Sequence, residues 1–220
     1  MRETVLALYD DLDTAQAAVR DLVAAGHDRS NIGLAVNDAD GKFSHHVHEG
    51  DEEVAVSRLE DEDVSGGEGA GFGAIIGGLT GIVAGLTAIT IPGIGPIIAA
   101  GPLAAALGGA TGGVIGAAAG AVTGGVTASL IDMGVPDSEA DYYAESLRRG
   151  SALVTCTVDE ADVQAVIDIL RKHNPFDIEQ RVTQWRMRGW RGFDPKADPY
   201  TAVDLAEERR SAHPSSPETA

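Results

Sequence analysis

Three histidines lie close together in a polar stretch of the chain. His45, His46 and His48 are followed directly by Glu49. Imidazoles two residues apart on an extended strand share a face, so His46 and His48 could hold Zn²⁺ or Ni²⁺ through neutral ring nitrogens. The sequence offers no second cluster of Cys or His to complete four ligands. We therefore interpret the stretch as a solvated loop, with loose metal binding or pH sensing as the alternative.

A glycine motif typical of dinucleotide binding occurs at residues 69–74, GAGFGA. Such a turn needs a hydrophobic strand before it and a helix after it, because the pyrophosphate lies on the helix N-terminus. Here an acidic loop precedes the glycines, and they continue at every fourth position. Nucleotide binding is therefore not expected.

The remaining reactive side chains do not form a recognisable catalytic set. The acidic run Glu49–Ser65 lacks the alternating spacing of a calcium loop and is interpreted as a solvated spacer. Cys156 alternates with core residues, which favours packing over nucleophilic attack. No serine lies in a GxSxG setting. We expect a protein that is not an enzyme, with no cofactor and no catalytic residue.

The chain is strongly acidic. Its 220 residues include 16 Lys and Arg against 34 Asp and Glu, a net charge of −18. This balance disfavours nucleic-acid binding and simple electrostatic docking on anionic lipid. The single cysteine excludes an internal disulfide and favours a reducing compartment. The N-terminal apolar run is too short for a signal peptide, so we expect the chain to begin in the cytoplasm.

The first unit, residues 1–38, is predicted to fold as strand, helix and strand. The two strands are the β-rich runs TVLALY (Thr4–Tyr9) and NIGLAV (Asn31–Val36). The helix between them is capped by Asp11 or Asp13. Its apolar positions follow helical spacing and are Ala15, Ala18, Val19 and Leu22.

Residues 132–185 repeat this scheme after an additional amphipathic helix, Pro136–Gly150. The strands predicted for the second unit are Ala152–Val158 and Phe176–Trp185, with a helix from about Ala161 between them. The apolar positions of this helix repeat the spacing of the first helix and are Val163, Val166, Ile167 and Leu170.

Together the two βαβ units predict an α+β fold. They would complete a four-stranded antiparallel sheet with two helices on one face, the split ferredoxin-like arrangement. Residues 39–68 form an acidic, His-containing loop between the halves. Residues 186–220 form a tail that could cover the domain through Trp190 and Phe193, and its end, from about 211, is expected to be disordered.

Residues 69–131 contain no charged side chain, and we refer to them as the uncharged segment. Breaks at Ile91–Pro96 and Gly101–Pro102 predict two helices, about 69–91 and 102–131. Glycines recur at every fourth position in both halves of the segment. These zipper glycines are Gly69, Gly73, Gly77, Gly81, Gly85, Gly108, Gly112, Gly116, Gly120 and Gly124.

Ten glycines inside helices would cost on the order of 10 kcal/mol relative to alanine. A lipid environment enforces the helical state, and small residues on one ridge let helices pack closely there. We therefore expect a membrane-inserted glycine-zipper hairpin that drives self-association, with lipid and other copies of the chain as partners. The protein would then be membrane-localised, with the sheet domain in the cytoplasm. The alternatives are a soluble homo-oligomer with a zipper-packed interior and an intermittently ordered linker.

Two stretches carry a resemblance to a known family. They are YYAESLRRGSALVTCTVD (Tyr142–Asp159) and HNPFDIEQR (His173–Arg181). In these stretches and in the order of its elements, the chain resembles the bacterial and archaeal YflT-type general stress proteins, often labelled general stress protein 17M-like. The resemblance implies a ferredoxin-like domain and a role in envelope or general stress adaptation. It implies no agreed reaction, cofactor or site residue. A small-ligand or metal sensor using the His-rich loop remains an alternative function.

Overall fold

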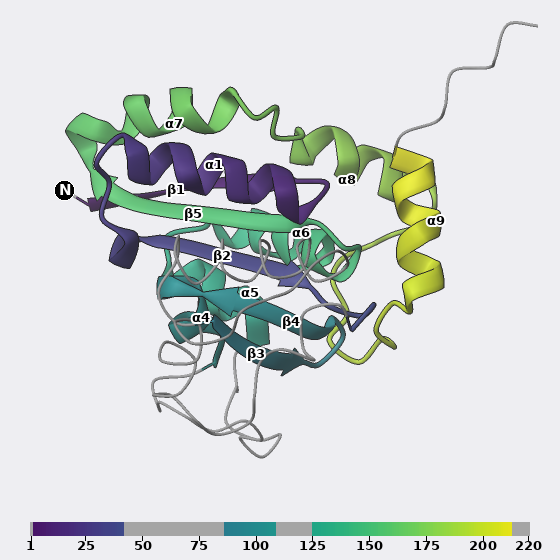
Figure 1. Ribbon diagram of the computed structural model, residues 1–220. Helices are drawn as coiled ribbons and strands as arrows, with labels where there is room; N and C mark the ends of the chain where they lie inside the picture. The colour runs from purple at the N-terminus through teal and green to yellow at the C-terminus, as the bar shows by residue number, and fades with distance from the viewer. Residues whose placement is uncertain (1, 42–85, 109–124, 213–220) are drawn as a thin grey trace, which may run out of the picture.

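The computed structural model describes residues 2–41, 86–108 and 125–212. In this part of the chain, a five-stranded antiparallel sheet lies between two layers of helices (Figure 1). The α+β class is therefore confirmed. The strands are β1 (Arg2–Tyr9), β2 (Ile32–Asn37), β3 (Leu86–Ile91), β4 (Gly95–Ala100) and β5 (Ala152–Asp159). The α-helices are α1 (Leu12–Ala24), α4 (Gly101–Gly108), α5 (Gly125–Asp132), α6 (Asp137–Arg148), α7 (Val163–Arg171), α8 (Ile178–Met187) and α9 (Ala202–Ala212).

The sheet joins the two ends of the chain. Its strand order is β1-β5-β2-β4-β3, so β5 from the second half lies between the two strands of the first half. Val5 is opposite Cys156, and Leu34 is opposite Val154. The expectation that the halves meet in one sheet is confirmed for these three strands.

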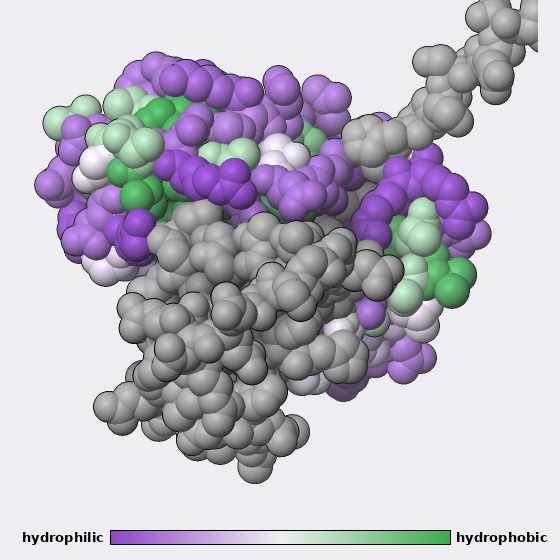
Figure 2. All heavy atoms as spheres, viewed as in Figure 1, coloured by the Kyte–Doolittle hydropathy of each residue, from purple (hydrophilic) through white to green (hydrophobic). Residues whose placement is uncertain are grey.

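Helices α1 and α7 cover one face of the sheet. Asp11 caps α1 by accepting a hydrogen bond from the Thr14 backbone N–H at 2.7 Å. The predicted apolar stripe of α1 is fully buried, and α7 contributes Val166 and Leu170 to the same core. The outer surface of these helices is mostly hydrophilic (Figure 2). Helical periodicity therefore identified the correct inward faces.

The predicted strand Phe176–Trp185 is wrong. The backbone N–H of Phe176 bonds Leu8 O at 3.0 Å, and the chain then turns into helix α8. Asp177 caps this helix by accepting from the N–H groups of Glu179 and Gln180. Its buried residues, Val182 and Trp185, are spaced as on a helix. The predicted four-stranded arrangement therefore lacks its last strand, and β1 is an edge of the described sheet.

The described parts of the uncharged segment also differ from the prediction. Residues 86–100 form a β-hairpin where the end of one helix and a break were predicted, and Gly93 and Gly95 at its turn have positive φ angles of 78° and 99°. The run ITIPGIGPII is rich in β-branched residues around a Pro/Gly turn, which favours a hairpin. Helix α4 ends at Gly108 and α5 begins at Gly125.

Helices α4, α5 and α6 pack on the opposite face of the sheet from α1 and α7. Their core includes Ile94, Ile97, Leu103, Leu130 and Leu147, each essentially inaccessible to water. The described parts of the uncharged segment thus supply two strands and two helices that bury one another, so these apolar residues are covered by protein.

These findings contradict the membrane-inserted hairpin. Among the described residues, no helix is both long and apolar enough to span a bilayer. The prediction of a transmembrane segment and the membrane localisation that followed from it are therefore wrong.

The tail after α8 lies on the domain. Trp185 is 3% exposed, and Phe193 packs against the core on the second face. The chain then continues into α9, a helix that the sequence interpretation did not include. The residues expected to be disordered are, from 213 onward, outside the described part of the chain.

Candidate functional site

Most of the predicted site residues lie outside the described residues. This holds for His45, His46 and His48, for the motif at 69–74, and for nine of the ten zipper glycines. The tenth, Gly108, is the last residue of α4. In residues 2–41, 86–108 and 125–212, no three His, Cys, Asp or Glu side chains gather as a metal site.

Cys156 is fully buried in the centre of the sheet. Burial raises the pKa of its thiol from 9.0 to about 11, because the thiolate would lose its hydration. The thiol is therefore neutral at physiological pH and belongs to the core.

This burial makes a testable prediction for Cys156. Because the pKa of the thiol is raised in the folded state, its contribution to stability is fully present below pH 9 and is lost as the pH rises from about 9 towards 11.

The burial of Cys156 also predicts its reactivity. A thiol reagent should react slowly with the native protein at pH 8 and rapidly in denaturant. Fast native labelling would show that the strand opens more readily than this packing allows.

The most concentrated group of charged and aromatic side chains lies where α6 ends. Gly150, with φ of 92°, closes this helix, and Leu205 of α9 packs directly over it. The last turn of α6 carries Glu145, Arg148 and Arg149. Cations are favoured at a helix C-terminus, where the backbone carbonyls are unpaired.

Glu145 is the buried anchor of this group. It has no exposed surface, yet it is a carboxylate. Its Oε1 accepts from Arg149 Nε at 2.6 Å and lies 3.5 Å from Arg148 Nη1. Its Oε2 has no hydrogen-bond partner within the described chain. A buried carboxylate is tolerated because it is paired with arginine.

Aromatic rings hold the two guanidinium groups in place. Arg149 stacks 4.7 Å from the Trp185 ring and 5.6 Å from the Tyr200 ring. Arg148 lies 4.5 Å from the Tyr200 ring and donates to Asp198 O at 2.9 Å. These cation–π contacts add to the ion pairs and restrict the arginine side chains.

Helix α9 supplies a second carboxylate to this group. Glu208 Oε1 pairs with Arg149 Nη1 at 2.5 Å, and Glu208 Oε2 lies 4.0 Å from Arg188 Nη1. Arg149 and Arg188 are the C-cap residues of α6 and α8. Two helix ends thus direct their arginines at one carboxylate of a third helix. We call Arg149 and Arg188 the arginine clamp.

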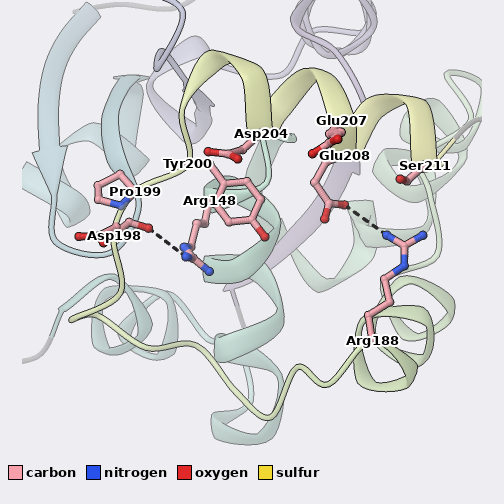
Figure 3. A pocket seen from close by; sticks show the side chains of 9 residues that line it. All are labelled: Arg148, Arg188, Asp198, Pro199, Tyr200, Asp204, Glu207, Glu208 and Ser211. Atoms are coloured by element: carbon pink, nitrogen blue, oxygen red, sulfur yellow. Dashed lines mark hydrogen bonds and ion pairs between the residues drawn. The ribbon is translucent and has the colours of Figure 1, made fainter.

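An open hollow of about 520 Å³ lies beside the clamp, between α9 and the loop that leads to it (Figure 3). Tyr200 lies on its floor, where burial raises the pKa of its phenol while Arg149 opposes the rise. The lining residues are Arg148, Arg188, Asp198, Pro199, Tyr200, Asp204, Glu207, Glu208 and Ser211. The arrangement is suited to holding charged groups in fixed positions.

The sequence interpretation did not identify this cluster. Arg149 and Glu208 are far apart in the chain, and α9 has only one buried apolar anchor, Leu205. The available signal was the Arg148–Arg149 pair at the end of a predicted helix, where cations are expected to interact with carbonyls or carboxylates.

Comparison with known proteins gives no further assignment. No family model matches the chain, and no match was found among curated proteins or solved structures.

Proposed function

We propose that the protein is a non-enzymatic, self-associating module of the general-stress type, which assembles in water without detergent. The observation that supports this most directly is the burial of the described parts of the uncharged segment, within residues 86–108 and 125–131, inside the domain. Leu103 and Leu107 of α4, with Val126 and Leu130 of α5, are at most 4% exposed. The described apolar side chains thus have protein partners.

The anchoring of α4 to α5 suggests where copies would meet. Ser129 Oγ donates to Ala106 O at 2.9 Å, so the end of α4 and the start of α5 are held side by side. The chain between them, residues 109–124, carries zipper glycines at positions 112, 116 and 120. In our proposal this ridge of small residues packs against the same ridge of another copy, where backbones can approach closely.

The stress role in this proposal rests on the sequence resemblance. The stretch Tyr142–Asp159 that carries it runs from α6 into β5, the strand that pairs with both β1 and β2. It also contains Glu145, Arg148 and Arg149, so it carries part of the charged cluster as well as the core.

Self-association is tested by sedimentation of the full chain without detergent. We expect the parent to form a defined oligomer. The Gly112→Leu/Gly116→Leu variant should shift towards monomer, because side chains on the ridge block close approach. Ala118→Leu, off the ridge, is the control and should sediment like the parent. A monomeric parent, or a double variant that assembles normally, would contradict the proposal.

A further inference from the structure

We propose that the arginine clamp is a binding site for a small oxyanion, a carboxylate or a phosphate, and that Glu208 of α9 is its internal competitor. The two oxygens of Glu208 each face a different arginine, Arg149 at 2.5 Å and Arg188 at 4.0 Å. One carboxylate is thus held between two guanidinium groups, which are the side chains that proteins prefer for binding carboxylates and phosphates.

The key arginine is positioned by groups outside α9. Arg149 is fixed by the buried Glu145 on α6 and by the ring of Trp185 on α8. Only 11% of the Arg149 side chain is exposed. The cation would therefore keep its orientation if α9 moved away, and a site that is organised in advance loses little entropy when it binds.

Helix α9 is held mainly by polar contacts. Leu205 is its one buried apolar residue in the described part of the chain, while Val203 is 70% exposed. Helix α9 also pairs Arg209 with Asp40 at 3.7 Å, and the Arg209 side chain of this pair is 46% exposed. Exposed ion pairs contribute little and are screened by salt. The Glu208–Arg149 pair is more enclosed, with side chains 19% and 11% exposed, so Glu208 leaves the clamp only when an incoming anion takes over its contact with Arg149.

The surroundings select a small ligand. Arg188 of the clamp and its partner Glu208 both line the open hollow (Figure 3), so a ligand in the hollow can reach them. The whole chain carries a net charge of −18, which repels large acidic partners over long distances. For a small anion, salt screens this long-range repulsion until the anion reaches the arginines. Glu208 itself shows that a carboxylate fits between them.

The test compares oxyanion binding by full-length variants. The only two tryptophans of the chain, Trp185 and Trp190, contact each other in this cluster, so their fluorescence reports on the site. Inorganic phosphate and acetate are titrated separately at constant ionic strength, with calorimetry as the second readout. Glu208→Gln should bind the preferred anion about 10-fold more tightly than the parent, because the neutral amide competes poorly for arginine.

The control is Glu160→Gln, which removes the same charge from an exposed position directly after β5, outside the lining of the hollow. This variant should gain less than about twofold in affinity. Adding Arg188→Gln to Glu208→Gln should abolish the gain. Equal affinities of the parent and Glu208→Gln for both anions would overturn the proposal, as would equal gains in the two glutamine variants.

The parent protein gives a test that does not depend on the folding of any variant. Saturating phosphate or acetate should increase hydrogen exchange in α9, because the anion replaces Glu208 in the clamp. If hydrogen exchange in α9 stayed constant at anion concentrations well above those used in the titrations, the proposal would also be overturned.

Discussion

Replacing Glu145 by alanine is expected to lower the free energy of unfolding by about 3 kcal/mol or more. The substitution removes the buried partner of Arg149 and Arg148, whose guanidinium groups lie 2.6 and 3.5 Å from Glu145 Oε1. Arg149 would still pair with Glu208 and stack on the aromatic rings, but its Nε would lose the buried carboxylate oxygen that accepts its hydrogen bond. The loss therefore comes mainly from the arginine left without its partner.

The measurement is equilibrium unfolding in urea at neutral pH, and Glu207→Ala on α9 is the control. Glu207 is exposed, so its truncation should change stability by less than about 0.5 kcal/mol. Glu145→Gln should fall between parent and alanine, because the amide oxygen still accepts one hydrogen bond. A Glu145→Ala protein as stable as the control would show that the ion pairs contribute nothing net.

Where periodicity is clear and packing is local, the sequence predicted the structure well. The stripe of α1 arises from the burial of one helix face, and Val154, Cys156 and Val158 of β5 enter the same core because side chains alternate along a strand. The meeting of β5 with β1 and β2 followed from the similarity of the two halves. For these elements, local preference and tertiary structure agree.

The uncharged segment could not be interpreted in the same way. A strand buried on both faces reads as a continuous apolar run, as does a buried helix, so periodicity does not separate them. Residues 86–91 were therefore assigned to the end of a helix although they form β3, and β4 lies in the stretch between the two predicted helices. The Pro/Gly turn between Ile91 and Gly95 was read as a break between helices, when it is the tight turn of a hairpin.

The charged cluster depended on information that a single sequence does not carry. Arg149 meets Glu208 and Trp185 only because α6 and α8 end beside the middle of α9. Each of these side chains alone is typical of a solvated helix surface. Their burial, and so their chemical interest, is a property of the fold.

Gly101→Ala is expected to lower the free energy of unfolding by about 4 kcal/mol, because it combines backbone strain with a steric clash. Gly101 begins α4 with φ of 65°, and an added Cβ would lie 2.2 Å from the carbonyl oxygen of Ile32 in β2. The chain also approaches closely at Gly33, where a Cβ would lie 2.8 Å from Leu103 Cβ. Helix α4 could accommodate the methyl group only by moving off the sheet, which would withdraw Leu103 from the core.

The matched control is Gly134→Ala, at a residue with φ of 101° and no atom within 4 Å of the added Cβ. It carries backbone strain without the clash and should cost only about 1–2 kcal/mol in the same urea measurement. The difference between the two variants isolates the contact of α4 with β2. If both variants lost the same stability, the described glycines would serve only to form turns. A larger loss at Gly101 would show that glycine in this segment lets two backbones pack closely within one protein domain, the role that the sequence alone had assigned to a membrane.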